Sequence, residues 1–375
     1  TQASFLSNNT YSDSLAKVND IGTISFVLDE KLRSISTIVN GDNVIMNEAD
    51  QNFLYNYSFS DSNDNGRILL SMFALDSASN QADTIIDRIY FDKTAPQLSA
   101  IFEGSINEDK VYSKHGDSLQ LSWQKVELES GLKRAYIGLG SDSGLVDVVN
   151  WTIASGDDES SLTSINLQNN SKYYGSIYLE DNVGNISDSL WGNGITIDLV
   201  PPVVGDVWDG FLDEDIDYTA DSTQLFIRWK DFTDNQAIDY YEMAIGTNND
   251  TINIANWQIS NFSDNMQIQG LDLERDIRYF AYLRAVDSAT NVSAVIKSDG
   301  VEFDNTPPDI KSIYPLFDSL QVLSVLNNDQ IKIGFNKPIL KFGFRVSASQ
   351  DTNLNYFSTI QDSGIIISIL DILPS

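Results

Sequence analysis

The 375-residue chain has no cysteine, a single histidine and few basic side chains. Without cysteine it can form no disulfide, use no thiolate in catalysis and hold no cysteine–metal centre. Any histidine-based catalytic triad would need His115, which stands in the turn-like stretch "SKHGD". The sequence also lacks a phosphate-cradling glycine loop and a nucleophile elbow. We therefore expect that this chain is not an enzyme.

Basic residues are outnumbered, since 23 Lys and Arg face 54 Asp and Glu, and the formal net charge is −31. Such a charge repels nucleic acid and anionic lipid, which excludes both as partners. No run approaches the ~18–20 apolar residues that cross a bilayer, so we expect no direct membrane insertion. Residues 1–10 lack the basic and apolar regions of a signal peptide, so an exported protein would be represented here by its mature chain or a fragment.

What the chain has in excess is aspartate, which supplies 42 of the 54 acids. Aspartate caps turns through its own backbone and is unfavourable inside helices. Hydrophobic residues make up 42% of the sequence, which is enough to build packed cores. The composition therefore predicts a folded, turn-rich β protein of more than one domain.

Two segments between residues 97 and 308 align without a gap at a constant offset of 106 residues. The matched pairs include Trp123/Trp229, Tyr173/Tyr279, Asp181/Asp287, Asn185/Asn291 and Asp198/Asp304. Within each segment apolar residues alternate with polar ones, as in "SLQLSW" and "QLFIRW", which is the period of half-buried strands. Two tandem domains of one kind follow, each predicted to be a β-sandwich.

The two repeats resemble fibronectin type III domains. "DSLQLSWQKV" is similar to that family's strand B with its core tryptophan, and "AYIGLGSDSG" to its strand C. Leu167 before Tyr173, and Leu273 before Tyr279, resemble its Leu-x5-Tyr pattern, which implies a tyrosine corner at the start of strand F. Of the flanks, "TISFVLDEKLRSISTIVNG" and "DQIKIGFNKPI" resemble strands of bacterial immunoglobulin-like repeats.

These resemblances predict an all-β chain of tandem immunoglobulin-like and fibronectin type III-like β-sandwiches arranged as an elongated rod. The expected division is an immunoglobulin-like domain at 1–96, fibronectin type III-like domains at 97–202 and 203–308, and an immunoglobulin-like domain at 309–375. The last range is short for a complete sandwich.

Each of the first three domains ends with an Asp, a turn and an Asn, followed by another Asp and a proline. One interpretation is structural, because Asp bonds turn amides and proline stiffens a junction. The other is calcium, which takes about 6–8 oxygen ligands. Its candidate ligands are Asp76, Asn80, Asp181, Asn185, Asp287 and Asn291. Asp92, Asp198 and Asp304 follow at the far ends of antiparallel strands, so we expect that they share no ion with these residues within one domain.

Several other residues are candidates for binding. The loops with Glu103, Glu108 and Asp109, and with Asp209, Glu214 and Asp215, form a second possible metal site, and "DSNDNG" at 61–66 resembles the start of an EF-hand loop. Trp151 and Trp257 share an aligned position and are expected in the core. Trp191 and Trp208 have no tryptophan at the aligned position of the other repeat, which makes them the candidates for glycan contact.

The sequence as a whole resembles a segment of a bacterial multi-domain surface protein. It predicts a non-catalytic spacer stalk, or modules that bind a protein or glycan receptor, in an extracellular, cell-surface protein whose other domains are its first partners. No cofactor is required, with calcium as the open alternative. The competing function is the accessory region, carbohydrate-binding or linking, of a secreted carbohydrate-active enzyme.

Overall fold

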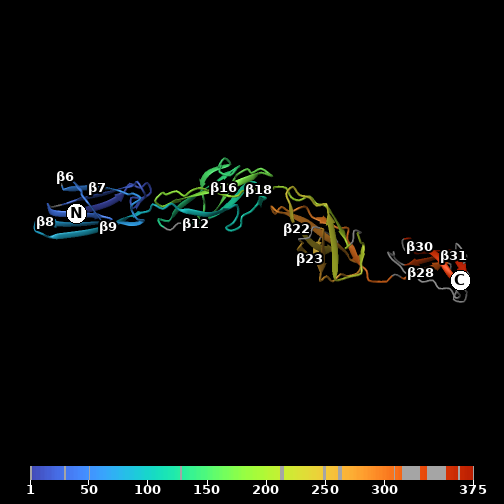
Figure 1. Ribbon diagram of the computed structural model, residues 1–375. Helices are drawn as coiled ribbons and strands as arrows, with labels where there is room; N and C mark the ends of the chain where they lie inside the picture. The colour runs from blue at the N-terminus through green and yellow to red at the C-terminus, as the bar shows by residue number, and fades with distance from the viewer. Residues whose placement is uncertain are drawn as a thin grey trace.

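The computed structural model describes residues 2–28, 31–49, 51–126, 129–211, 215–247, 251–260, 264–307, 309–314, 330–335, 352–361 and 364–374. Strands, with no helix, form the regular structure of these residues, so none of them builds a helix that could span a membrane. The sheets follow one another along an elongated molecule (Figure 1), as the resemblance predicted. We call the successive pairs of sheets module 1, module 2 and module 3, and the last sheet module 4.

Module 1 packs a four-stranded sheet against a five-stranded one around a core rich in phenylalanine, which includes Phe5, Phe26, Phe59 and Phe91. The first sheet has the order β1 (Gln2–Ser7), β3 (Ile21–Val27), β7 (Asn52–Ser58), β6 (Asn47–Ala49). The second has the order β2 (Leu15–Ala16), β9 (Gln81–Phe91), β8 (Gly66–Asp76), β4 (Leu32–Val39), β5 (Asp42–Val44).

Module 2 has a smaller and a larger sheet. The small sheet has the order β10 (Gln97–Phe102), β12 (Ser118–Val126), β15 (Glu159–Thr163). The large sheet has the order β11 (Tyr112–Ser113), β18 (Ile195–Ile197), β16 (Lys172–Asp181), β13 (Leu132–Gly140), β14 (Val149–Ile153), with β17 (Leu190–Trp191) paired to β16.

Module 3 repeats this topology strand for strand. Its small sheet has the order β19 (Asp206–Asp209), β21 (Gln224–Lys230), β24 (Asn265–Gln269). Its large sheet has the order β20 (Tyr218–Thr219), β27 (Val301–Phe303), β25 (Arg278–Asp287), β22 (Ile238–Thr247), β23 (Thr251–Ser260), with β26 (Ile296–Lys297) paired to β25. The same sheet order in both modules is the structural counterpart of the 106-residue repeat in the sequence, and it confirms the predicted tandem sandwiches.

The two repeat tryptophans occupy equivalent core positions. Trp123 is 0% exposed and Trp229 is 1% exposed, and each packs between the two sheets of its module. The backbone N–H of Trp123 donates to the Asp158 carbonyl at 2.9 Å, and that of Trp229 donates to the Asp264 carbonyl at 3.0 Å. Burial alternates along β12 and β21, as the period-two pattern predicted.

A tyrosine corner closes both modules. The Tyr173 hydroxyl accepts a hydrogen bond from the Gln168 amide at 3.0 Å, and the Tyr279 hydroxyl accepts one from the Glu274 amide at 2.7 Å. Both tyrosines are buried at the start of the long strands β16 and β25. The expected pattern of a sandwich is therefore present at the end of each module opposite to its Asp–turn–Asn stretch.

The expectation for Trp151 and Trp257 was wrong. Both are half-buried and lie outside the core clusters, because β14 and β23 are edge strands whose tryptophans pack on the outer side of the large sheet. Trp151 contacts Tyr178 edge-on at 4.8 Å between ring centroids, and Arg284 lies over the Trp257 ring at 4.3 Å. The aligned position of Trp151 and Trp257 is therefore a surface position in both modules and not a core position.

The described part of module 4 is one antiparallel sheet with the order β28 (Ile310–Tyr314), β29 (Gln330–Phe335), β31 (Gly364–Pro374), β30 (Thr352–Gln361). The C-terminal apolar run 365–373 therefore pairs with two strands of its own module. The Asn–Lys–Pro part of the expected immunoglobulin-like strand lies outside the described residues.

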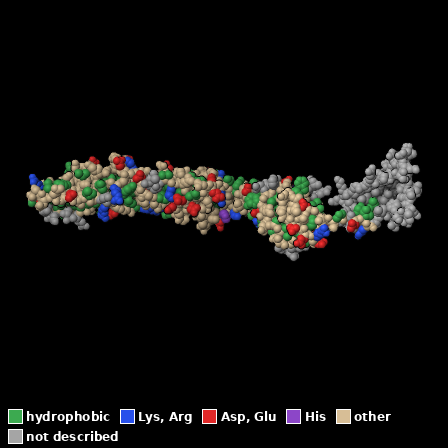
Figure 2. Space-filling view, turned by 90° about the horizontal axis from the view of Figure 1, so that it is seen from below, with side chains coloured by type: hydrophobic (Ala, Val, Ile, Leu, Met, Phe, Trp, Pro, Cys, Tyr) green, Lys and Arg blue, Asp and Glu red, His purple; other side chains and the backbone are tan. Residues whose placement is uncertain are grey.

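Modules 1 and 2 lie nearly in line, and module 3 is inclined to them (Figure 1). Figure 2 shows acidic side chains scattered along one face of the molecule, interspersed with Lys and Arg. Charges of both signs are thus spread along this face of the molecule.

Candidate functional site at the module junctions

The recurring Asp and Asn form the same arrangement in modules 1, 2 and 3, which we call the Asp–Asn clasp. In each clasp one carboxylate oxygen of the Asp accepts the backbone N–H of the Asn at 2.7 Å. The other oxygen accepts the side-chain amide of the same Asn at 2.6–2.9 Å. The three clasps are Asp76–Asn80, Asp181–Asn185 and Asp287–Asn291.

The clasp holds a turn whose backbone is left-handed one residue before the Asn. Ser79, Gly184 and Thr290 occupy this position with φ values of 68°, 91° and 68°. A residue other than glycine is strained in this left-handed conformation, yet modules 1 and 3 have Ser79 and Thr290 there. In module 2 the Asp181 carboxylate also accepts the amides of Val183 and Gly184, at 3.0 and 2.7 Å. These bonds support the structural interpretation of the recurring Asp.

Each internal clasp also reaches the module before it. The Asn185 side-chain amide donates to the backbone carbonyl of Asp92 at 3.1 Å, and that of Asn291 donates to the carbonyl of Asp198 at 2.9 Å. Within module 2, Tyr173 pairs with Ile195, so Asp198 leaves the sandwich at the end opposite to Asp181. The acid that closes one module therefore meets the clasp of the next one.

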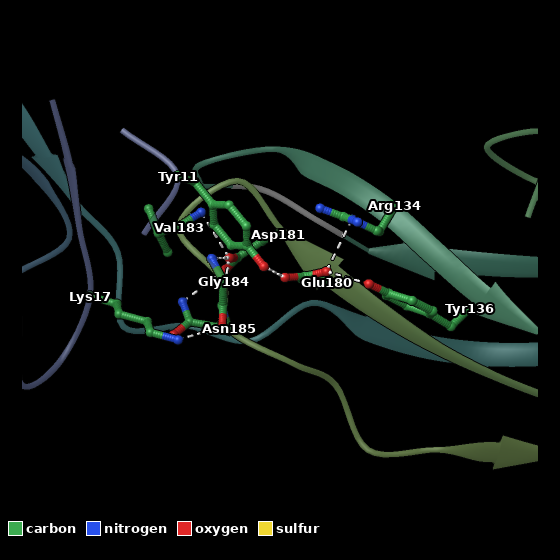
Figure 3. A network of polar contacts seen from close by, with 9 residues as sticks. All are labelled: Tyr11, Lys17, Arg134, Tyr136, Glu180, Asp181, Val183, Gly184 and Asn185. Carbon is green, nitrogen blue, oxygen red and sulfur yellow. Dashed lines mark hydrogen bonds and ion pairs between the residues drawn. The ribbon is translucent and has the colours of Figure 1, made fainter. Parts of the chain in front are cut away.

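A polar network joins modules 1 and 2 (Figure 3). The Tyr11 hydroxyl donates to the Glu180 carboxylate, and the Lys17 ammonium donates to the Gly184 carbonyl at 2.6 Å. The Asn9 side-chain amide donates to the Val183 carbonyl at 2.9 Å. Module 1 thus satisfies two carbonyls of the clasp turn as well as one carboxylate beside it.

Glu180 is the centre of this network although it is only 5% exposed. The Arg134 guanidinium and the Tyr136 hydroxyl each lie 3.1 Å from its second oxygen (Figure 3). The Lys133 ammonium lies 2.8 Å from the centre of the Tyr11 ring. The hydrogen bond to Glu180 raises the pKa of the Tyr11 hydroxyl, so it remains a donor. These donors satisfy the hydrogen-bonding needs of the buried carboxylate.

The junction of modules 2 and 3 uses the same clasp with different neighbours. The Asn235 side-chain amide donates to the Asp198 carboxylate at 3.0 Å, and the Gln236 side-chain amide donates to the Asn170 side-chain oxygen at 2.7 Å. The Lys114 ammonium donates to the Thr290 carbonyl at 3.1 Å, where Lys17 serves in the first junction.

The loop 61–66 is held by a lysine. The Lys93 ammonium donates to the carbonyls of Asp61 and Asn63, both at 2.8 Å, and the Lys93 amide donates to the Asn65 side chain. A protein cation thus binds backbone oxygens of the loop whose side chains the sequence suggested as calcium ligands.

The acidic loops after β10 and β19 each bury one carboxyl. Glu103 is 0% exposed and accepts the amides of Gly175 and Gly194 at 3.0 and 3.2 Å. Burial, with the nearby Asp109 carboxylate, raises the pKa of Glu103 to about 7. Asn193 donates to the partner acid Asp109 at 2.6 Å.

In module 3 the corresponding acids are Asp209, Asp215 and Asp299, which bring one oxygen each within 4.8 Å of one another. Burial raises the pKa of Asp209 to about 7. Glu214 lies outside the described residues. A metal site at this loop stays a prediction.

The remaining candidates are on the surface. His115 is exposed in a groove between modules 2 and 3. Trp191 is half-buried, and its ring centroid lies 5.9 Å from that of Trp151. Trp151 in turn contacts Tyr178, whose ring stacks on that of Tyr136. Trp208 is half-buried between the cations of Arg228 and Lys230.

No protein-family model matches the chain, and no curated protein matches it. Among solved structures it is similar to the FN1–FN3 domains of chicken CNTN1, with a TM-score of 0.39, 11% identity, and coverage of 76% of this chain and 96% of that one. It is also similar to a structure from a 1.5-MDa bacterial ice-binding adhesin, with a TM-score of 0.35, 13% identity, and coverage of 80% and 97%. For a tetra-tandem repeat in the extending region of a large adhesion protein the TM-score is 0.28, with 15% identity and coverage of 99% and 88%. At these low scores, the fold assignment rests on the sheet order and the cores described above.

The raised pKa of Glu103 predicts how stability depends on pH. Between pH ~4.5 and ~7 the unfolded chain loses this proton before the folded one, so module 2 should lose on the order of 2 kcal/mol as pH rises through this window. Glu103→Gln keeps an acceptor for both glycine amides and removes the titration. Calorimetry at pH 4.5 and 8 should show a flatter dependence than wild type. Glu108→Gln, at an exposed position of the same loop, is the control, and an equal flattening there would contradict the assignment.

Proposed function

We propose that this chain is a non-catalytic structural or adhesive segment of a bacterial cell-surface protein, acting as a stalk that holds other domains away from the surface. The observation that carries the proposal is the repeated junction. Both described junctions pass one Asn side chain from the clasp of one module to a backbone carbonyl of the module before it. A connection repeated at each step makes a linear assembly with a defined direction.

Several properties suit a stalk. Each sandwich adds roughly 30 Å, from strands of about 8–10 residues at ~3.3 Å per residue. Pro96, Pro201 and Pro202 follow the closing acids and limit the backbone freedom of the connections. A strong negative charge keeps neighbouring stalks soluble and apart. The partners are then the other domains of a larger surface protein, together with a protein or glycan receptor.

Small-angle scattering of the isolated chain tests the stalk. The maximum dimension should approach the summed lengths of the modules, roughly 120 Å for four of them at ~30 Å each. A compact particle with the radius of gyration of a globular 375-residue protein, about 21 Å, would contradict the proposal. The measurement needs physiological salt, because at low salt the net charge alone would extend a flexible chain.

The second candidate function is the accessory region of a secreted carbohydrate-active enzyme, and one observation favours it. Trp191, Trp151, Tyr178 and Tyr136 form a continuous aromatic cluster on the outer side of module 2. In module 3 the positions that align with Tyr136 and Tyr178 carry Glu242 and Arg284, which form an ion pair. Aromatic faces of this kind can stack on sugar rings.

Glycan-array binding tests this alternative. The accessory function predicts binding by the wild-type chain that is lost in Trp191→Ala, and retained in Trp208→Ala because that ring already lies between two cations. No binding by the wild-type chain, or equal binding by both variants, would speak against a glycan site at Trp191.

A further inference from the structure

Three carboxylates meet at the junction of modules 2 and 3. Asp198 closes module 2, Asp234 precedes β22, and Asp287 belongs to the clasp of module 3. One oxygen from each lies within 4.8 Å of the other two. Asp198 and Asp287 are both 0% exposed, so water does not screen their charges.

Two oxygens in this group are buried without a hydrogen-bond donor. One Asp198 oxygen accepts the Val200 amide at 3.1 Å and the Asn235 side chain at 3.0 Å, whereas its Oδ2 has no hydrogen-bond partner among the described residues. Asp234 accepts the Gln236 amide at 2.9 Å through one oxygen, and its Oδ1 is likewise buried without a described partner. A buried carboxylate oxygen that is not bonded is costly, and such groups need an explanation.

The junction of modules 1 and 2 is the internal comparison. There the Asp92 carboxylate accepts the Thr94 amide at 2.8 Å through one oxygen and the Ser130 amide at 2.9 Å through the other. The sequence position that corresponds to Asp234 is Leu128, which carries no charge. Among the described residues, the first junction therefore satisfies both oxygens of its closing acid with backbone donors, whereas the second brings three acids together and leaves two oxygens open.

Protein cations do not neutralise the group within the described part of the chain. None of the described Lys or Arg side chains forms an ion pair with Asp198, Asp234 or Asp287. The Lys114 ammonium, which reaches this junction, donates to the Thr290 carbonyl. The balance of charge thus calls for a positive ion from solution.

We infer that Asp198, Asp234 and Asp287 bind a calcium ion that links module 2 to module 3. All the donors are oxygens, which selects a hard cation. Calcium accepts several carboxylates in irregular geometry, whereas magnesium demands a near-ideal octahedron and retains its water. The ion joins the last acid of one module to two acids of the next, so it stiffens this junction. The stiffening rests on the proposed stalk function, whereas the binding does not.

The experiment uses the full chain, freed of metal by dialysis against a chelator, and titrates it with CaCl₂ in a calorimeter. Wild type should show a saturable site, and Asp234→Asn should weaken that site at least tenfold. Asp272→Asn removes the same charge from an exposed position near the tyrosine corner, at the other end of module 3, and should bind as wild type does. Titration with MgCl₂ should give a weaker response than calcium.

Asp234→Leu provides a second variant, since it copies the residue at the corresponding position of the first junction. It should fold, as checked by circular dichroism, and should lose the calcium-dependent rise in melting temperature. The inference is overturned if wild type shows no saturable calcium binding, or if Asp234→Asn binds like Asp272→Asn. An elongated chain without calcium binding would overturn the site alone, whereas a compact chain that binds calcium would overturn the stalk alone.

Discussion

The structure depends on one side-chain amide that serves two modules. In the clasps of modules 2 and 3 the Asn side-chain amide donates one hydrogen bond to the Asp carboxylate, which holds the turn. It donates a second hydrogen bond to a backbone carbonyl of the preceding module. The turn is therefore in its working conformation before the neighbour arrives, and little side-chain entropy is lost when the junction forms. Because the contact is with a backbone carbonyl, the previous module needs only to present the end of its last strand.

The two junctions share the Asp–Asn clasp but differ in the polar and charged residues around it. At the first, Tyr11, Lys17 and Asn9 extend the contact, and the Glu180 carboxylate is surrounded by donors. At the second, Asn235 donates to the Asp198 carboxylate, and three described acids each bring an oxygen within 4.8 Å of the others. Modules that share a topology need not share an interdomain stiffness, and Figure 1 shows modules 1 and 2 in line with module 3 inclined.

Much of the fold could be predicted from the sequence because the signals were local or repeated. The alternation around Trp123 and Trp229, and the pattern before Tyr173 and Tyr279, reflect contacts inside one module, which a 106-residue repeat makes visible twice. Edge-strand tryptophans follow the same period, so the sequence did not separate Trp151 and Trp257 from the core. The division of the flanks into immunoglobulin-like domains stays a prediction from resemblance.

The candidate site was only half predictable. The spacing of Asp181 and Asn185 indicated a turn, and the antiparallel strands that follow placed Asp198 at the other end of the sandwich. It did not indicate that Asp198 meets Asp287, because that contact depends on how one module follows another. A signal was available in the repeat itself, since Asp92 precedes Asn185 by 93 residues and Asp198 precedes Asn291 by the same separation.

The central claim is that the clasp of one module orients the module before it. Distances between spin labels at Ile85→Cys in module 1 and Ile153→Cys in module 2, both exposed, measure this orientation directly, since the chain has no cysteine of its own. The account predicts a narrow distance distribution that broadens in Asn185→Ala and is unchanged in Asn80→Ala, whose clasp lies at the end of module 1 away from the junction. A distribution that is equally broad in the parent and in Asn185→Ala would contradict it.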